Sequence, residues 1–339
     1  KLIYAYFTYI LFMTLYTAIN IPYSALGGVM AGDSSERASI QSFRFAGGML
    51  GGAFVVYFLP EFVEYFGDGD EVEGFPKAMA VMGLIVIGLL WTCFAFTKER
   101  VTPRIDVHAK NASVRQDISE TIKNNQWVIV ALITFFLLTA VATRGSVTNY
   151  YIEYYFGRPD SKGMFNLIGM LAGIAGALSV NLVKDKICKV SLFRWASIIV
   201  IFLHLGFIPL SREQYEIALL LSASANFFHM MVTVLLFSMV PDTVEYGKKV
   251  LKSMGNAMAM SFAGHLLALK LGIAVGGLIA GWSLAYVGYT ANVEQSEMTL
   301  NGIVWIYAGG PIFFGLMIIT LLKFYILTNS EMRKYSQTS

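Results

Sequence analysis

Nine apolar runs, each long enough to cross a lipid bilayer, recur along this 339-residue chain. A transmembrane helix needs about 20 apolar residues to span roughly 30 Å of hydrocarbon. The runs occupy residues 2–31, 43–66, 78–97, 126–156, 163–183, 191–211, 215–240, 254–288 and 301–327. Only 14% of the residues are charged, against about 25% in an ordinary soluble domain. The sequence therefore predicts an all-α polytopic membrane protein with nine visible transmembrane helices.

The basic residues between the runs indicate how the chain is oriented. The connections between successive runs fall into two alternating sets. One set holds eighteen lysines and arginines, and the other holds four, which are Lys77, Arg158, Lys162 and Arg212. Because cytoplasmic loops are enriched in basic residues, the larger set and the C-terminus are predicted to be cytoplasmic. The net charge of +3 is too small to indicate a nucleic-acid partner.

The number of runs predicts how the chain is divided. An odd number of spans with a cytoplasmic C-terminus places Lys1 outside, so we expect an N-terminal truncation with an odd number of spans upstream. The longest polar connection precedes six spans, which is the layout of transporters built from two six-helix halves. On that plan three helices of an expected twelve are absent. The predicted divisions are the remainder of an N-terminal bundle, a cytoplasmic middle loop, a six-helix C-terminal bundle and a cytoplasmic tail, at residues 1–97, 98–125, 126–328 and 329–339.

The first run carries polar residues that share one face of a helix. Tyr16, Asn20 and either Tyr23 or Ser24 follow helical spacing, and Pro22 loosens the backbone within one turn of Asn20. Polar groups at membrane depth need partners, so this face favours a ligand pathway. The alternative is a helix interface in which Asn20 and the tyrosines satisfy one another.

Arg44, Arg144 and Lys270 are basic residues inside or at the ends of predicted spans. A basic residue near a helix centre costs about 2.5 to 3.5 kcal/mol on insertion scales, so it is usually paired or faces water. The interiors of the nine runs contain no Asp or Glu. We therefore expect the carboxylate partners in helices upstream of Lys1. Arg44 could instead snorkel to the membrane interface.

Acidic and basic residues are mixed in two predicted turns at equivalent ends of the two halves. The first turn contains Asp33, Glu36 and Arg37, and the second contains Asp242 and Glu245. We expect salt bridges between these turns to form a cytoplasmic gate that closes the inner face.

Histidines and amides within the spans are further candidates. A lone membrane histidine is usually a hydrogen-bonded interior residue, and we interpret His204 and His229 in this way. His265 lies five residues before Lys270, so it is predicted to contact a ligand. The weaker candidates are the polar residues Asn149, Asn226 and Thr233.

Glycines recur at a four-residue spacing that permits close helix packing. They are Gly47 with Gly51, Gly48 with Gly52, Gly169 with Gly173, Gly272 with Gly276, and Gly277 with Gly281. Either static packing or the sliding of two bundles explains this spacing.

Other functional classes lack their motifs. The sequence shows no His-rich metal cluster, no paired carboxylates within the spans and no phosphate-binding glycine loop, so a membrane enzyme is not indicated. No pore loop or repeated filter indicates a channel. Cys93 and Cys188 are the only cysteines and indicate neither a disulfide framework nor a thiol metal site.

Several short motifs carry a family resemblance. In chain order they are Asn20 to Leu26, Glu36-Arg37 with Ser42 to Arg44, Arg144-Gly145 before Tyr150-Tyr151, Pro241 to Gly247, Lys270 to Gly272, and Asn292 to Ser296. Together they resemble the glycoside-pentoside-hexuronide:cation symporter family over essentially the whole chain, starting at that family's fourth helix. The resemblance implies a major-facilitator fold in which a sugar and a coupling cation, sodium, lithium or proton, bind in a central cavity and cross by alternating access.

The resemblance also implies roles for residues of the first run. Tyr16 matches a sugar-site aromatic residue, and Thr17 matches a hydroxyl near the cation site. Asn20 stands where melibiose-type members have an aspartate that serves both ligands, and an amide supplies no charge. Ser24 stands where those members have a tryptophan near the sugar, so the pocket should differ in shape.

Two basic residues complete the implied site. Lys270 matches a lysine that reaches toward the cation site, and its ammonium could replace a coupling cation in a proton-driven or uncoupled carrier. Arg144 could bind a sugar hydroxyl or a uronate carboxylate through two hydrogen bonds. The predicted substrate-binding set is Tyr16, Asn20, Ser24, Arg44, Arg144, Asn149, Thr233, His265 and Lys270, and the predicted cation-binding set is Thr17 and Asn20.

The expected partners are a sugar, a coupling cation and membrane lipid. No other cofactor is expected, and no metal beyond a transported sodium ion. The protein is expected to be a monomer. An uncoupled facilitator or an exchanger of a related small solute is the alternative function.

Overall fold

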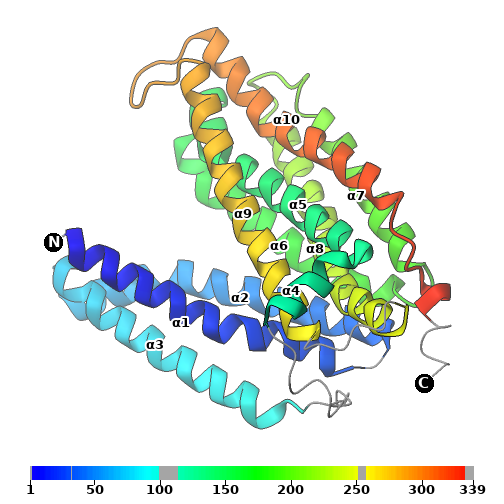
Figure 1. The fold of residues 1–339 in the computed structure, drawn as a ribbon. Helices are drawn as coiled ribbons and strands as arrows, with labels where there is room; N and C mark the ends of the chain where they lie inside the picture. Colours follow the sequence, from blue (N-terminus) through cyan, green and yellow to red (C-terminus); the bar gives the residue numbers. More distant parts are fainter. Residues whose placement is uncertain (1, 32, 99–113, 251–256, 333–339) are drawn as a thin grey trace.

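The computed structural model describes residues 2–31, 33–98, 114–250 and 257–332, and this part of the chain is helical (Figure 1). Eight of the described helices are long and apolar enough to cross a membrane. They are α1 (Leu2–Val29), α2 (Ser34–Gly67), α3 (Glu71–Phe96), α5 (Asn125–Tyr150), α6 (Lys162–Val183), α8 (Tyr215–Val250), α9 (Ala257–Tyr286) and α10 (Glu297–Leu322). The shorter helices are α4 (Val114–Lys123) and α7 (Lys189–Leu205), with a π-helical turn at Tyr151–Tyr155 and a 3₁₀ turn at Pro159–Ser161.

The predicted count of nine spanning helices is not confirmed, because the run at 191–211 forms the 17-residue α7. At 1.5 Å per residue α7 is about 26 Å long, which is less than the roughly 30 Å of hydrocarbon. The helix ends at Leu205, where Gly206 is its C-cap and Pro209 follows. Glycine and proline both interrupt helices, so the last predicted residues form turns instead.

The prediction that the two segments of the gate are turns is wrong, because both segments are helical. Asp33 is the N-cap of α2, and its side chain accepts hydrogen bonds from the amides of Ser35 at 2.8 Å and Glu36 at 3.3 Å. This cap starts α2 ten residues before Arg44, so Arg37 lies within the helix. Likewise α8 continues through Pro241 instead of ending there.

Parts of the predicted divisions lie outside the described residues. They are residues 99–113 of the middle loop, 251–256 before α9, where the predicted run at 254–288 begins, and 333–339 of the tail. The end of the middle loop is described, and there α4 occupies ten residues before α5.

The long helices form two groups. In the C-terminal group α5 packs against α9 and α10, α6 packs against α8, and α7 packs against α8 and α10. In the N-terminal group α2 contacts α1 and α3. Between the groups α2 contacts α6 and α8, and α1 contacts α9. Figure 1 shows the groups diverging from the end where α1 ends and α2 begins, which we call the junction end.

The buried apolar core lies mainly in the C-terminal group. One cluster includes Ile133, Phe193 and Leu236 from α5, α7 and α8, and a second includes Tyr151 and Tyr307. By contrast, α1 and α3 expose most of their apolar side chains. An apolar surface of this kind fits contact with lipid.

The glycine spacings give close contacts at some positions. A Cβ at Gly272 would lie 2.5 Å from the carbonyl oxygen of Phe135, and one at Gly276 would lie 2.6 Å from that of Thr139. Close packing of α9 on α5 is therefore confirmed at these two glycines. At Gly47, Gly48, Gly51, Gly52, Gly277 and Gly281, nothing in the described part of the chain lies within 4 Å of such a Cβ.

Candidate functional site

Lys270 connects the two groups of helices. From α9 its Nζ donates a hydrogen bond of 2.7 Å to Thr17 Oγ1 on α1, and it lies 5.6 Å from the centroid of the Tyr16 ring. Thr17 in turn donates to the carbonyl of Met13 at 2.7 Å. The structure therefore brings together three residues that the sequence placed in sugar and cation binding.

Arg44 connects α2 to α1. Its Nη2 donates to Ser24 Oγ at 2.9 Å, and its Nη1 donates to Gln41 Oε1 at 3.3 Å. The guanidinium carbon lies 4.7 Å from the centroid of the Tyr23 ring, which is a cation–π distance. Ser24 is fully buried. We call Tyr16, Thr17, Ser24, Arg44 and Lys270 the interface cluster.

The interface cluster is basic, and the described residues do not neutralise it. Neither Arg44 nor Lys270 has a carboxylate within salt-bridge distance in the part of the chain that the structure describes. Asn20 is half-buried next to this cluster on α1, and its amide has no hydrogen-bond partner among those residues. The expected carboxylates upstream of Lys1 stay a prediction.

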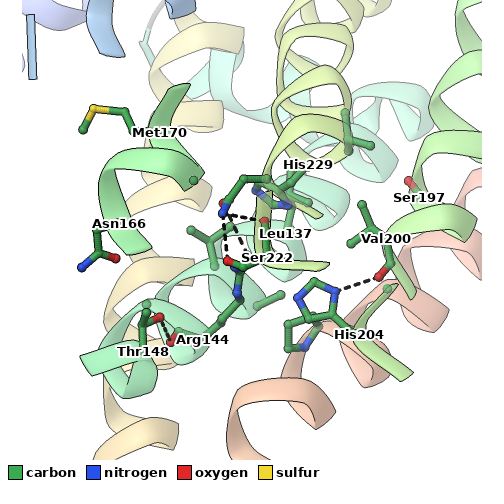
Figure 2. A pocket seen from close by; sticks show the side chains of 18 of the residues that line it. Leu137, Arg144, Thr148, Asn166, Met170, Ser197, Val200, His204, Ser222 and His229 are labelled. Atoms are coloured by element: carbon green, nitrogen blue, oxygen red, sulfur yellow. Dashed lines mark hydrogen bonds between the residues drawn. The ribbon is translucent and has the colours of Figure 1, made fainter. Parts of the chain in front are cut away.

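Arg144 lies elsewhere, in a cavity of about 360 Å³ between α5, α6, α7, α8 and α10 (Figure 2). This volume is typical of sites for small organic ligands. Polar residues of the lining, most of them labelled in Figure 2, include Asn166, Ser197, His204, Ser222 and His229. From the N-terminal group, Met49 of α2 also reaches the lining.

Arg144 is held by three neutral partners. Its Nη2 donates to Ser222 Oγ at 2.9 Å and to Tyr307 OH at 3.1 Å, and its Nη1 donates to Asn226 Oδ1 at 3.4 Å. The guanidinium carbon also lies 5.1 Å from the centroid of the Tyr307 ring. These contacts fix the side chain without neutralising its charge.

His204 presents one ring nitrogen that has no partner. Its Nδ1 lies 2.7 Å from the carbonyl oxygen of Val200, as Figure 2 shows. A carbonyl only accepts hydrogen bonds, so Nδ1 carries the hydrogen. In the neutral imidazole Nε2 is then an acceptor, and this buried atom has no hydrogen-bond partner among the described residues.

The other members of the predicted substrate-binding set that are not yet placed lie outside the cavity lining, whereas the weaker candidate Asn226 lines it. Asn149 is exposed and accepts a hydrogen bond of 3.3 Å from Asn166. Thr233 bonds to the carbonyl of His229 within its own helix, at 3.0 Å. His265 is fully buried, with Nδ1 at 3.1 Å from Thr134 Oγ1. Of the nine predicted substrate residues, Arg144 alone lines this cavity.

Sequence reasoning gave too little weight to the polar face of α8. Ser222, Asn226 and His229 follow i, i+4, i+7 spacing and all line the cavity. The signal was present in the sequence, because this spacing places three polar groups on one side of a long apolar helix. The contribution of Tyr307 had no such signal, since it lies 163 residues from Arg144.

A buried ionic network joins the groups at the junction end. Arg37 Nη1 of α2 lies 3.3 Å from Asp242 and 3.4 Å from Glu245, both on α8. Asp242 also pairs with Lys189 at the start of α7. Arg37, Asp242 and Lys189 are all buried. The structure thus brings together three of the five predicted gate residues and adds Lys189, whereas Asp33 caps α2 and Glu36 is exposed.

Hydroxyl and amide groups continue this junction between α2 and α6. Ser39 donates to Asn181 Oδ1 at 2.5 Å, and Asn181 Nδ2 donates to Ser42 Oγ at 2.8 Å. Ser35 donates to Asp185 at 2.5 Å. Ser35, Ser39 and Ser42 lie on one face of α2, so the first three turns of α2 are joined by polar contacts to α6 and to Asp185, which follows α6.

Asn181→Ala should lower stability by about 2 kcal/mol, because it removes two hydrogen bonds worth about 1 kcal/mol each. Thermal unfolding of the purified protein in detergent measures the loss. Thr92→Ala is the matched control, since exposed Thr92 donates to the carbonyl of Gly88 in its own helix and makes no other side-chain hydrogen bond with the described residues. Equal effects of the two substitutions would show that the bonds of Asn181 across the junction add nothing.

Comparisons with known proteins add a family match. Residues 1–329 match the family described as MFS/sugar transport protein. The chain is 34% identical over 337 residues to the inner membrane symporter YicJ of Escherichia coli, covering 98% of this chain and 72% of that protein. It is 31% identical to the putative glycoside/cation symporter YagG of the same organism, covering 99% and 72%. It is also 27% identical to the isoprimeverose transporter of Lactiplantibacillus pentosus, covering 95% and 67%.

Proposed function

This chain belongs to the MFS/sugar transport protein family, and from that premise we propose that it carries a sugar across the bacterial cytoplasmic membrane together with a cation. The family and the relatives named above are transporters, so the chain is a multi-pass membrane transporter and not an enzyme. The proposed substrate is a glycoside, pentoside or hexuronide, and the proposed cation is sodium or a proton.

The contact between Lys270 and Thr17 carries this proposal. It lies between α9 and α1, which belong to different groups, so it must break when the groups separate there. Residues of the interface cluster offer hydroxyl, aromatic and cationic groups, which suit sugar hydroxyls and a sugar ring. Alternating access requires a site that both halves of the carrier form.

An uncoupled facilitator or exchanger is the second candidate, and Asn20 favours it. Its amide supplies no charge for a cation. The ammonium of Lys270 already occupies a hydrogen-bonded position at Thr17, the residue proposed for cation binding. A fixed cation there would replace a transported one.

We propose that the buried ionic network of Arg37, Lys189, Asp242 and Glu245, which we call the junction network, is the cytoplasmic gate. We propose that this end faces the cytoplasm together with the C-terminus, because basic residues gather near it and cytoplasmic loops are enriched in basic residues. In the described conformation Arg37 and Asp242 hold the gate closed. The proposed full architecture is twelve helices in two six-helix bundles, with α7 counted as a span, acting as a monomer in lipid.

Counterflow in membrane vesicles tests the proposed function. Vesicles that contain the protein are preloaded with an unlabelled sugar and diluted into the same sugar in radiolabelled form. A carrier should accumulate label only when internal sugar is present. Proton and sodium movement recorded during sugar addition separates symport from uncoupled exchange. Label uptake that ignores internal sugar would contradict a carrier mechanism.

Lys270→Met should lower the rate of sugar exchange at least about tenfold, and Thr17→Val should lower it by a smaller factor. The substitutions remove a charged hydrogen bond, worth about 1.5 to 3 kcal/mol, between the two groups. The rate is measured by counterflow at equal protein content. Lys323→Met is the matched control, because Lys323 is an exposed lysine at the end of α10. A Lys270→Met protein that exchanges sugar as fast as Lys323→Met would rule out this role.

A further inference from the structure

The C-terminal segment, residues 323–332, follows α10 (Figure 1) and joins the starts of α5 and α7. The amide of Ile326 donates to Gln126 Oε1 of α5 at 3.0 Å, and Gln126 Nε2 donates back to a carbonyl of the segment at 3.4 Å. Asn329 Oδ1 accepts a hydrogen bond of 3.2 Å from the amide of Lys189, the first residue of α7. These contacts hold the segment against the C-terminal group, beside the junction network.

Tyr325 lies in this segment among residues that flank the junction network. Only 4% of the residue is exposed. It belongs to the buried apolar cluster that includes Val190 and Val240, which flank Lys189 and Asp242 in the chain. The Tyr325 hydroxyl is buried and has no hydrogen-bond partner in the part of the chain that the structure describes. A buried hydroxyl without a partner destabilises the conformation that contains it.

The charge of Asp242 acts on this hydroxyl. Burial raises the pKa of Tyr325 well above its ordinary value, and the negative charge of Asp242 raises the pKa further. The hydroxyl therefore keeps its proton and can donate a hydrogen bond, and a carboxylate can accept several. Two groups that pair with the Asp242 carboxylate are Arg37, at 3.3 Å, and Lys189. In the described conformation Tyr325 is not among its partners.

The two cationic partners of Asp242 belong to different groups of helices. Lys189 starts α7, and its Nζ also donates to the carbonyl of Ser238 on α8 at 3.3 Å, so it stays with Asp242 in the C-terminal group. Arg37 lies on α2, and its Nε donates at 3.1 Å to the carbonyl of Ala31, which belongs to the N-terminal group. Separation of the groups therefore takes Arg37 away from the carboxylate and leaves Lys189 there.

We propose that Tyr325 takes the place of Arg37 when the gate opens. Its hydroxyl donates to the Asp242 carboxylate in the open conformation and has no partner among the described residues in the closed one. Tyr325 is thus a positioning residue of the gate, which acts through Asp242. A charged hydrogen bond that only the open conformation makes shifts the balance toward opening. This inference rests on the proposed gate and adds a residue that favours its open conformation.

Tyr325→Phe tests the inference, because it removes the hydroxyl and keeps the buried ring. Opening is measured as the rate at which a maleimide labels Ala38→Cys, in a background that carries Cys93→Ala and Cys188→Ala. Ala38 is 2% exposed on α2, directly after Arg37, so its labelling reports separation of the groups. The maleimide is kept dilute, so that the rate follows the open population. Tyr325→Phe should slow labelling about tenfold, the effect of one lost charged hydrogen bond, and should slow sugar counterflow.

The stability of the closed conformation gives an independent readout. Tyr325→Phe should unfold at the same temperature as the wild type or a higher one, because the closed conformation loses only a hydroxyl without a partner. In an Arg37→Met background the hydroxyl can bond to Asp242 without opening, so the same substitution should lower the unfolding temperature. A tyrosine that only packs would have the same effect in both backgrounds. If Arg37→Met does not fold, the labelling result decides.

Tyr215→Phe is the matched control. Tyr215 is also 4% exposed, and its hydroxyl also lacks a hydrogen-bond partner among the described residues. It lies at the start of α8, at the opposite end of that helix from Asp242. The control should leave both labelling and counterflow unchanged. Each variant is first shown to elute as a single species and to unfold cooperatively.

The outcomes separate this inference from the proposed function. Labelling of Ala38→Cys that Tyr325→Phe leaves unchanged, or that Tyr215→Phe slows equally, would overturn the inference and leave sugar transport standing. A fall in unfolding temperature of the same size in the wild-type and Arg37→Met backgrounds would also overturn it, because the hydroxyl would then stabilise the closed conformation. Slower labelling in Tyr325→Phe, together with no sugar counterflow in the wild type, would support the inference and contradict the transport proposal alone.

Discussion

Replacing Asp242 with asparagine is expected to destabilise the protein by about 3 to 5 kcal/mol. Asp242 is fully buried and pairs with both Arg37 and Lys189, so the substitution leaves two buried cations beside a neutral amide. Glu245 compensates Arg37 only in part, from 3.4 Å. Thermal unfolding in detergent measures the loss of stability.

The same substitution should open the junction. Cys188 is half-buried at the N-cap of α7, directly before Lys189, so its labelling by a maleimide should become faster when the network is broken. Cys93 on α3 is the internal reference, because it lies outside the network.

Glu73→Gln is the matched control for Asp242→Asn. It also neutralises an acid in a salt bridge, but its pair with Lys77 at 3.2 Å is exposed. Exposed pairs contribute at most about 1 kcal/mol, so little change is expected. If Asp242→Asn unfolds at the same temperature as Glu73→Gln and Cys188 reacts no faster, the network does not hold the junction closed.

Gly176→Ala is the second substitution with a large expected effect, a loss of about 3 kcal/mol. A Cβ at Gly176 would lie 2.7 Å from the carbonyl carbon of Phe227 and 2.9 Å from its Cα, both backbone atoms of α8. A backbone cannot rotate away as a side chain can. The helices α6 and α8 would have to separate, and this would also move the lining of the Arg144 cavity. Thermal unfolding in detergent measures the loss of stability.

Gly277→Ala serves as the comparison for Gly176→Ala. Gly277 lies inside α9, and nothing described lies within 4 Å of a Cβ at that position. Alanine favours helix by about 1 kcal/mol over glycine, so this variant should be as stable as the wild type or slightly more so. If the Gly176→Ala protein unfolds at the same temperature as the Gly277→Ala protein, α6 and α8 are not in direct backbone contact at Gly176.

The helical class and most helices could be predicted from the apolar runs, but several ends could not. Hydropathy detects the apolar part of a helix and misses polar extensions. Asp33 caps α2 well before the apolar run begins, and α8 passes Pro241 and adds nine more residues. The opposite error occurred at α7, where the run looked long enough but Gly206 ended the helix.

The sequence could predict which residues belong to polar sites more readily than it could predict which of them lie together in the structure. Periodicity on α1 identified the face that carries Tyr16 and Ser24, and the ionic pairing of Arg37 with Asp242 followed from complementary charges. Local spacing does not report which helices become neighbours. Arg144 was therefore grouped with Lys270, whereas the structure surrounds it with Ser222 and Tyr307 in a different cavity.

The junction network has a consequence for how the carrier responds to salt. Its four charges balance when the groups meet: Arg37 and Lys189 are positive, and Asp242 and Glu245 are negative. Separation takes Arg37 away with α2 and leaves a net charge of one negative unit on the C-terminal side. Opening thus separates opposite charges. Dissolved ions favour opening because they screen the charge that it leaves on each of the two groups of helices. The open conformation should become more populated as the ionic strength at the junction end rises.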